Sequence, residues 1–403
     1  MKTKLFLLLF FFPLWLSSCG DDDNSVPEPP VEKRGTVLVY MAADNSLSHF
    51  ASEDLEEMKE GWASMNTSGK HLLVYVDTGT SPRLIELKKN GKEVEEKVIK
   101  EYADRNSVGV AEMQEVFKDV FQNTRFQAGS YGFVYWSHGD GWIPNPLPST
   151  RWMGQDTGNG THYMNIDALA SVLETAPRFD FILFDACFMQ SVEVAYELKK
   201  YTDYYIGSPA ENPGPGAPYD RIVPYMFQKG AADKIASECF AVYRDKYDAG
   251  HGISNSNWTG GTAICVLKTS ELENLASATR NALAGVAADT DGLRDRIFDT
   301  DRRNSYSSSY VGYFDFVEMM ETLVEDASAL ATWRRAFDAA VCYWNTTPKI
   351  YSAISGMFSM ERSHGVTHYI PSFGNNPEEA EAYRSMAWYA AVGLDLTFSY
   401  PNE

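Results

Sequence analysis

Short apolar runs alternate with amphipathic stretches through the first half of the chain. Five of these runs are almost wholly apolar, which is typical of strands that are buried on both faces of a sheet. They cover residues 36–43, 71–79, 131–137, 179–186 and 203–208. Helical periodicity lies between them, at residues 49–64, 110–123, 165–175 and 189–199. Such an alternation predicts an α/β fold with a mostly parallel sheet and helices on both faces.

A hairpin and a less regular second half complete the pattern. Residues 83–99 alternate between polar and apolar around Asn90-Gly91, a dipeptide that favours a two-residue hairpin turn. Further helices are expected at 231–247, 269–288, 313–325, 326–345 and 377–391, and further strands at 261–267 and 364–370. The stretches 249–260 and 299–310 are rich in Gly, Ser and Asn and are expected to be exposed loops.

The first residues have the pattern of a targeting segment. Lys2 and Lys4 precede an apolar run at residues 5–16, which is too short to span a bilayer as a helix and is typical of a secretory signal. The run leads to Leu-Ser-Ser-Cys19-Gly, which resembles the lipobox of bacterial lipoproteins, where the Cys is acylated and the chain is cut before it. The alternative is an ordinary signal followed by a chance Cys. We expect a signal peptide at 1–18 and a membrane-lipid anchor at Cys19.

Residues 19–35 are expected to hold the rest of the chain away from the membrane. They contain three Pro and a cluster of acids, and they lack apolar periodicity, which favours an extended, solvated tether. The acidic run 21–23 resembles export tags of surface lipoproteins, although a solvated tether would be acidic as well. The expected location is the bacterial cell envelope, with the protein anchored to the outer membrane and facing either the periplasm or the exterior.

Composition narrows the class of protein. The chain has 403 residues with 55 acidic and 35 basic side chains, so its net charge is -20; loss of residues 1–18 removes two lysines and lowers it to -22. This acidity argues against nucleic-acid binding, which needs a basic face. An apolar fraction of 44% is enough for a sizeable core. The length suggests two domains, or one large α/β domain with an appendage.

The best candidate chemistry lies where two predicted strands end. One strand leads into Ser-His138-Gly139, and another into Asp185-Ala-Cys187. Ligands bind at the carboxyl ends of strands in open parallel sheets, so His138 and Cys187 could meet there. A Cys thiolate is a good nucleophile and an imidazole can hold or take its proton. The N–H of Gly139 could approach a substrate carbonyl without a Cβ in the way.

A structural role is the competing interpretation for each of these residues. Cys is among the most buried residue types, and a lone Cys in an apolar stretch is usually inert. The remaining cysteines, Cys239, Cys265 and Cys342, fit that description and receive no role. His364 and His368 have no evident carboxylate partner and are also expected to be structural. The residues alone leave a Cys–His hydrolase and an inert core about equally open.

Three stretches resemble the clostripain family of cysteine peptidases, relatives of caspases, legumain and gingipains. They are VLVYMAADNSL (37–47), VYWSHGDGW (134–142) and ILFDACFMQSVEVAYEL (182–198). Residues 204–220 and 365–372 fit the same family. The resemblance covers residues 36–395 as one peptidase domain, followed by a tail at 396–403. It implies a caspase-like three-layer sandwich with helical additions in the C-terminal half.

The resemblance also implies roles at the site. Cys187 matches the nucleophile and His138 its partner, and the oxyanion donors would be the backbone N–H groups of Gly139 and Cys187. Family members cleave peptides after Arg or, in some, Lys, so Asp185 would receive the basic side chain through charge-assisted pairing. A strand-end acid with only a capping role is the alternative for Asp185.

Several secondary expectations depend on the same resemblance. Asp220, Glu211 and Asp156 are weaker candidates for the specificity pocket, and Pro-Ala-Glu211 stands where many relatives have Gln-Glu. If the chain matures by cutting itself, we expect the cut after Arg151. No cofactor is required by the sequence; calcium is a family possibility, but the Asp-rich segment 289–301 does not follow the order of an EF-hand.

Two other function classes remain open at this stage. One is a catalytically silent relative that binds proteins or glycans at the cell surface with the pocket reused. The other is a Cys-dependent amidase or transpeptidase that acts on non-protein amides. The interpretation that the residues favour is an envelope-tethered cysteine endopeptidase whose partners are peptides with Arg or Lys.

Overall fold

A computed structural model describes residues 35–79, 81–142, 153–158, 160–250, 260–303, 310–372 and 377–398. The predicted signal peptide, Cys19, the tether and Arg151 lie outside these residues. Within the described ranges, no helix is both long enough and apolar enough to cross a membrane.

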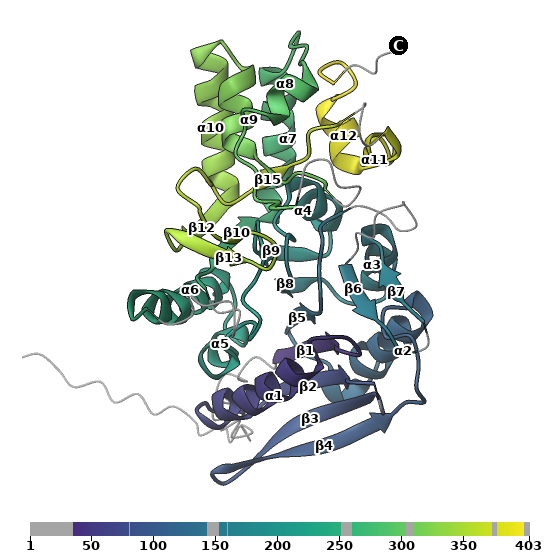
Figure 1. Ribbon diagram of the computed structural model, residues 1–403. Coiled ribbons are helices and arrows are strands. Elements are labelled where there is room, and N and C mark those ends of the chain that lie inside the picture. The colour runs from purple at the N-terminus through teal and green to yellow at the C-terminus, as the bar shows by residue number, and fades with distance from the viewer. Residues whose placement is uncertain are drawn as a thin grey trace, which may run out of the picture. The chain divides into compact units, whose positions relative to one another are not determined.

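A nine-stranded sheet forms the centre of the fold (Figure 1). Its order is β12-β10-β9-β8-β5-β1-β2-β3-β4, and the five strands from β9 to β2 are parallel. The edge strands β10, β12, β3 and β4 run antiparallel to their neighbours. The bounds are β1 Gly35–Ala42, β2 Lys70–Asp77, β3 Arg83–Asn90, β4 Glu93–Glu101, β5 Ser130–Trp136, β8 Phe179–Asp185, β9 Thr202–Gly207, β10 Ala263–Lys268 and β12 Val341–Thr346.

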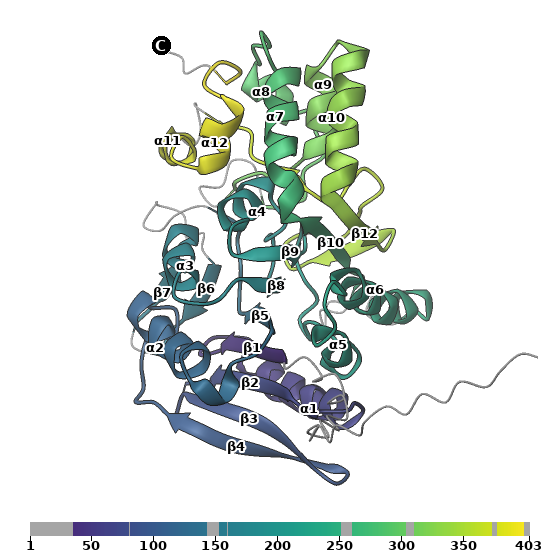
Figure 2. The ribbon, with the colours of Figure 1, turned by 180° about the vertical axis from the view of Figure 1, so that it is seen from behind.

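Helices cover both faces of this sheet, as the apolar strands predict (Figures 1 and 2). One face carries α1 (Ser48–Ala63), α5 (Tyr219–Met226) and α6 (Ala232–Asp248), and the other carries α2 (Val110–Phe121), α3 (Ile166–Leu173) and α4 (Val192–Leu198). The side chains of β1 alternate between the two faces. Val37, Val39 and Met41 belong to the apolar core beneath α1, α5 and α6. Leu38, Tyr40 and Ala42 belong to the core beneath α2, α3 and α4. The three-layer α/β fold is confirmed.

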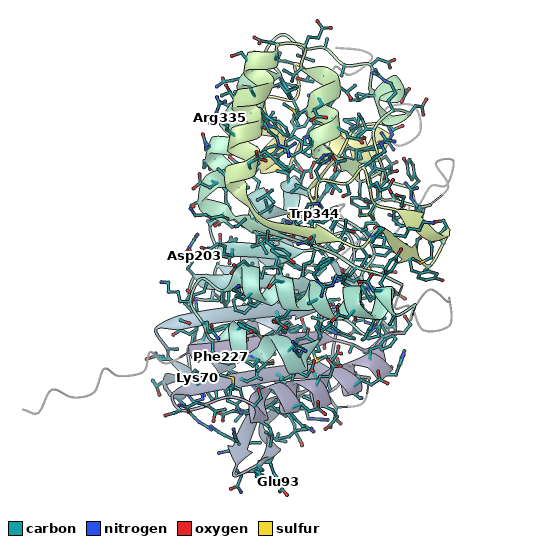
Figure 3. The ribbon with its side chains drawn as sticks, turned by 90° about the vertical axis from the view of Figure 1, so that its left-hand side faces the viewer. Lys70, Glu93, Asp203, Phe227, Arg335 and Trp344 are labelled. Carbon is teal, nitrogen blue, oxygen red and sulfur yellow. The ribbon has the colours of Figure 1, made fainter. Side chains whose placement is uncertain are left out.

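The first helical face is closed by aromatic packing at the N-terminal end of the parallel strands. Trp62 of α1 packs against Phe227, with ring centroids 5.2 Å apart. Figure 3 shows Phe227 beside Lys70, which pairs with Gly35 at the start of β1 and β2. The predicted site residues His138 and Cys187 follow the opposite, carboxyl ends of β5 and β8.

The C-terminal half adds helices beyond the β12 edge of the sheet (Figure 1). They are α7 Leu272–Ala282, α8 Thr290–Arg294, α9 Phe316–Leu323, α10 Ala327–Ala340, α11 Pro377–Tyr383 and α12 Ala387–Val392. Two short pairs of strands accompany them: β11 Phe314–Asp315 with β15 Thr367–His368, and β13 Lys349–Ser352 with β14 Gly356–Ser359. A third pair, β6 Met153–Asp156 with β7 His162–Met164, lies beside α3 (Figure 1).

Several predicted boundaries in this half are wrong. The expected helix 326–345 ends at Ala340, because the β-branched and aromatic residues that follow form β12 and complete the sheet edge. The helix expected at 377–391 is broken into α11 and α12, and the strand expected at 364–370 has only two paired residues. The loop expected to be exposed from residue 299 is instead buried as far as Asp301, which is 3% exposed.

Candidate active site

The register of two parallel strands brings the predicted pair together. Trp136, the last residue of β5, pairs with Asp185, the last residue of β8. His138 and Cys187 each follow two positions later, so they leave the same edge of the sheet at the same level. A Cβ on Gly139 would lie 2.7 Å from the carbonyl oxygen of Cys187 and 2.8 Å from the Cβ of Ala186. Glycine is therefore what allows the two strand ends to touch.

A contact from the end of β1 holds the imidazole. Nε2 of His138 is 2.9 Å from Oγ of Ser46, and the carbonyl of His138 accepts a hydrogen bond from Gly154 N at 2.8 Å. Burial lowers the pKa of His138. Burial therefore favours the neutral form of this imidazole.

The nucleophile candidate stands on a strained turn. Phe188, directly after Cys187, has a φ of 57°, which is an unfavourable conformation for a bulky residue. Its N–H donates to Ala210 O, and its ring stacks on Tyr313 with centroids 4.7 Å apart. Such a turn ends β8 sharply and is fixed by contacts from residues far along the chain.

The thiol is protonated at rest. Asn212 N–H donates to Sγ of Cys187 at 3.3 Å, but burial and then the carboxylate of Glu211 raise the pKa of the thiol to about 12. A thiol with so high a pKa does not rest as a thiolate at neutral pH. The backbone N–H groups of Gly139 and Cys187 donate to no acceptor within the described residues, so they are available to a substrate oxygen.

Asp185 is a buried carboxylate with only neutral donors. It is 7% exposed; its Oδ2 accepts from Ala217 N at 2.8 Å and from Tyr219 Oη at 3.0 Å, and its Oδ1 lies 3.5 Å from Asn212 Nδ2. Burial raises its pKa. Among the residues that the structure describes, it forms no ion pair. It lines a cavity of about 30 Å³ together with Ser208, Asn212, Pro213, Gly216, Tyr243 and Thr262.

The weaker pocket candidates lie elsewhere. Glu211 accepts hydrogen bonds from Ser352 Oγ at 2.5 Å and from Ala353 N at 2.9 Å. These bonds connect the loop after β9 to the β13–β14 hairpin. Asp156 accepts from Ser107 N at 2.7 Å and from Gly158 N at 3.1 Å. Asp220 sits in the first turn of α5 near Glu57. None of these acids lines the cavity that Asp185 lines.

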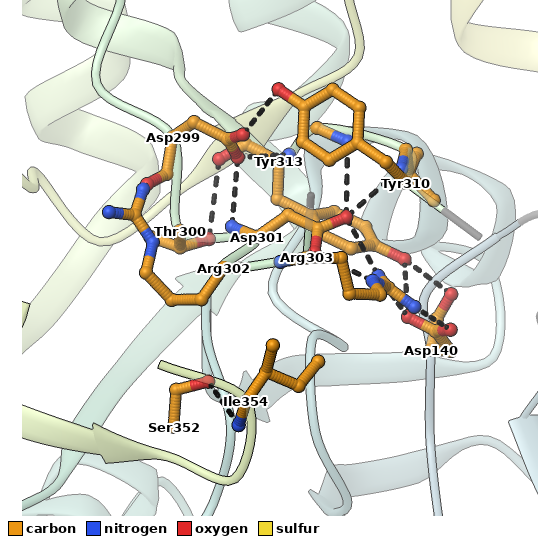
Figure 4. A network of polar contacts seen from close by, with 12 residues as sticks. Asp140, Asp299, Thr300, Asp301, Arg302, Arg303, Tyr310, Tyr313, Ser352 and Ile354 are labelled. Atoms are coloured by element: carbon orange, nitrogen blue, oxygen red, sulfur yellow. Dashed lines mark hydrogen bonds and ion pairs between the residues drawn. The ribbon is translucent and has the colours of Figure 1, made fainter. Parts of the chain in front are cut away.

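An arginine clamps the loop that carries His138 (Figure 4). The guanidinium of Arg303 makes a bidentate pair with Asp140 at 2.6 and 2.9 Å, and it also contacts both oxygens of Asp301 at 2.6 and 2.8 Å. It lies 5.6 Å from the centre of the Phe188 ring. Arg303 therefore joins the His138 loop, the turn after Cys187 and the 299–303 segment, which the sequence treats as an exposed loop.

The described residues do not provide a set of side-chain ligands that fits calcium. No group of three or more His, Cys, Asp or Glu side chains is placed there to hold a metal ion. In the Asp-rich segment, Asp299 accepts from Tyr310 Oη and Tyr313 N, and Asp301 is used by Arg303. No step of the chemistry below is assigned to a metal.

Comparison with known proteins decides the family. The clostripain family model matches residues 39–394. This chain belongs to the clostripain family. A search of the curated proteins finds no match. The resemblance of the strand-end motifs to that family is confirmed, and the family is one of C11 cysteine proteases.

Three solved C11 structures share the fold across most of the chain. A secreted C11 protease from Bacteroides thetaiotaomicron, in complex with an irreversible peptide inhibitor, is 45% identical with a TM-score of 0.81, covering 90% of this chain and 100% of that one. An inactive zymogen from Parabacteroides distasonis is 29% identical with a TM-score of 0.75, covering 89% and 98%. A second secreted B. thetaiotaomicron protease, iotapain, is 25% identical with a TM-score of 0.75, covering 90% and 100%.

Sequence reasoning missed the residues that support the site. Ser46 and Tyr219 each contact the predicted trio through one hydroxyl oxygen, and Asn212 contacts it through its backbone N and its Nδ2. Arg303 carried no signal, because its contact with Asp140, 163 positions away, is made only by the fold. The residue type gave no sign that Phe188 has a positive φ, since glycine or asparagine usually occupies such positions.

The protonated thiol predicts a distinct alkylation profile. Because the thiol pKa is about 12, the iodoacetamide rate at Cys187 should rise about tenfold per pH unit from pH 7 to 9.5 without a plateau. Glu211→Gln should raise the rate by removing a neighbouring negative charge, whereas the exposed Glu325→Gln should not. Mass spectrometry of the Cys187 peptide follows the reaction; a plateau below pH 7 would instead reveal a resting ion pair.

The Arg303 clamp predicts a large loss of stability on truncation. Arg303→Met leaves Asp140 and the buried Asp301 without their cation, so the free energy of unfolding should fall by about 3–5 kcal/mol. Arg334→Met removes only an exposed pair with Asp338 and should change it by less than about 0.5 kcal/mol. Denaturant unfolding of both variants measures the difference; equal effects would contradict the assigned role of the clamp.

Proposed function

We propose that this protein is a cysteine endopeptidase that cleaves peptide bonds after Arg, and also after Lys. The observation that carries the proposal is Asp185, a buried carboxylate held by neutral donors, two residues before Cys187 and beside a small cavity. A buried carboxylate without a cationic partner is costly. A basic substrate side chain would supply the missing charge.

The contacts of Asp185 explain why Arg and Lys should both fit. Its Oδ2 already accepts two hydrogen bonds, from Ala217 N and Tyr219 Oη, whereas its Oδ1 is approached only by Asn212 at 3.5 Å. An incoming cation therefore meets chiefly Oδ1. A single contact serves an ammonium group as well as a guanidinium, so we expect weaker discrimination between them than a fully bidentate pocket would give.

The dyad performs the chemistry in two stages. Sγ of Cys187 attacks the scissile carbonyl, its proton passes through His138 to the leaving amine, and the C–N bond breaks to leave a thioester on Cys187. Water then attacks the thioester, His138 takes its proton, and the acid product leaves as Sγ regains a proton. In both stages the N–H groups of Gly139 and Cys187 would hold the negative oxygen. The high pKa of the Cys187 thiol suits a nucleophile that is deprotonated only as it attacks.

The solved relatives support a peptidase and raise the question of maturation. One is a secreted protease bound to an irreversible peptide inhibitor, and another is an inactive zymogen. For this chain we propose maturation by a cut after Arg151, which lies outside the described residues. The two fragments would be seen by mass spectrometry of wild type and would be absent from Cys187→Ala.

Tethering to the envelope is the second part of the proposal. It depends on the lipobox-like Cys19 and the acidic, Pro-rich residues after it. A secreted relative agrees with a location outside the cytoplasm. Labelling with a fatty-acid analogue should mark wild type and should be lost in Cys19→Ala.

Fluorogenic peptides test the activity directly. Wild type should release aminomethylcoumarin from peptides ending in Arg and Lys and not from one ending in Asp. Asp185→Asn should lower kcat/KM for Arg by roughly 30-fold or more, because it removes the partner of a buried cation. The same variant should leave cleavage of a citrulline peptide, which has no charge, nearly unchanged. An equal loss for Arg and citrulline would contradict a charge-selective role for Asp185.

The two alternatives predict other outcomes in this assay. Cys187→Ala and His138→Ala should abolish turnover if the dyad is catalytic. A catalytically silent binding protein would cleave none of the peptides, whether or not the chain had been cut after Arg151. An amidase or transpeptidase would leave the peptides whole and would transfer or hydrolyse a non-protein amide in a Cys187-dependent way.

A further inference from the structure

A second buried carboxyl, that of Asp54, lies behind the proposed specificity residue. Asp54 belongs to α1 and is 1% exposed, and Asp185 lies at the end of β8. A Cβ on Gly216 would be 2.8 Å from Oδ2 of Asp185 and 3.2 Å from Oδ2 of Asp54, so these two oxygens are at most about 6 Å apart. Gly216 has a φ of 71° and no Cβ, which allows the backbone to pass between the two acids.

The surroundings of this pair contain acids, phenols and a thiol. Asp54 Oδ2 accepts one hydrogen bond, from Trp136 Nε1 at 2.7 Å. Neither Asp54 nor Asp185 forms an ion pair with any residue that the structure describes. The titratable groups that face them are Glu53 and Glu57 of α1, Tyr219 of α5, and Cys239 and Tyr243 of α6.

Electrostatics therefore leaves one negative charge on the pair. Two ionised carboxylates this close in a buried site repel each other strongly, so one of them retains a proton. Asp185 accepts three hydrogen bonds and Asp54 accepts one, so the charge rests on Asp185 and the proton on Asp54. Burial, and then the charge of Asp185, raise the pKa of Asp54 to about 10.

We propose that Asp54 is a positioning residue of the specificity pocket, a second carboxyl that releases its proton to solvent when a basic side chain binds Asp185. The inference rests on the proposed function, because it needs a cation at Asp185. That cation cancels the field of Asp185 at Asp54 and attracts the second carboxylate. The loaded pocket then holds two carboxylates and one cation, and the affinity for the cation depends on the proton of Asp54.

The sign of the pH dependence follows from this coupling. The pKa of Asp54 is lower with the cation bound than without it, so binding releases a proton. Cation affinity therefore rises as the pH rises through the bound-state pKa of Asp54, and it levels off above the free-state value. Protonation of Asp185 also weakens binding, but it acts on the acid side, since Asp185 is the carboxyl that is ionised first.

Calorimetry with n-propylguanidine, which matches an Arg side chain in size and has no other titrating group, tests the inference without any turnover. The protein is the full chain with Cys187→Ala, which also removes the titration of the thiol. The proton count comes from binding enthalpies in phosphate and Tris at pH 8.5. We expect fractional release of up to one proton and a fall in Kd of at least about threefold between pH 7 and 9.5.

Asp54→Asn in the same background is the decisive variant. Its amide oxygen can still accept from Trp136, but it carries no titrating proton, so the release should vanish and Kd should become flat over this range. Glu57→Gln is a necessary comparison, because burial raises the pKa of Glu57 to about 7; it should leave the release at pH 8.5 unchanged. Asp338→Asn, an exposed change in α10, is the matched control.

The outcomes separate this inference from the proposed function. Binding of n-propylguanidine without proton release, or with release that persists in Asp54→Asn, would overturn the role of Asp54 and leave the basic pocket intact. No binding to any variant would overturn the basic pocket and this inference with it. If Asp54→Asn fails to fold, Trp136→Phe serves instead: loss of the one donor raises the pKa of Asp54, so the fall in Kd should move to higher pH. An unmoved profile would contradict the inference.

Discussion

The pairing of β5 with β8 is the constraint on which the site depends. Trp136 and Asp185 end the two parallel strands in register, and the next residues carry His138 and Cys187 off the same edge. The contact is close because Gly139 has no Cβ to separate the two loops. A shift of one residue would turn the strands' core faces over and would also separate the imidazole from the thiol. Packing of the sheet and the placement of His138 and Cys187 at one edge are thus one requirement.

The loops beyond these strand ends are fixed by charge and by strain. Arg303 joins Asp140, next to the His138 loop, to the buried Asp301, while Phe188 holds a left-handed backbone against Tyr313. The titratable groups around Asp185 are acids, phenols and a thiol, and burial favours the protonated, neutral form of each of them. Under the proposed function, the net charge of the chain would steer basic substrates only in a general way, and selectivity would require the local carboxylate of Asp185.

Much of the fold was predictable because the parallel core strands carry a strong apolar pattern. The strands β1 to β5, β8 and β9 and the helices α1 to α4 appear close to their predicted ranges, whereas the short strands β6 and β7 were not predicted. The elements at the sheet edge were not predictable in the same way. Residues 341–346 continue a helical pattern in the sequence, and they form the strand β12 because they pair with β10. At the site, strand ends and neighbouring residue types singled out His138 and Cys187, whereas the role predicted for Asp185 came from the family resemblance. Asp54 and the contact of Arg303 with Asp140 could not be found, because Trp136 and Asp140 are distant from them in the sequence and adjacent only after folding.

Covalent labelling tests the central claim most directly, namely that Cys187, His138 and Asp185 form one Arg-selective site. The wild type would be treated with an acyloxymethyl ketone peptide ending in Arg, and with the same peptide ending in Asp, and the adduct located by peptide mass mapping. We predict a thioether on Cys187 from the Arg compound alone, slowed in His138→Ala and in Asp185→Asn. An adduct on another cysteine, or equal labelling by both compounds, would contradict the account.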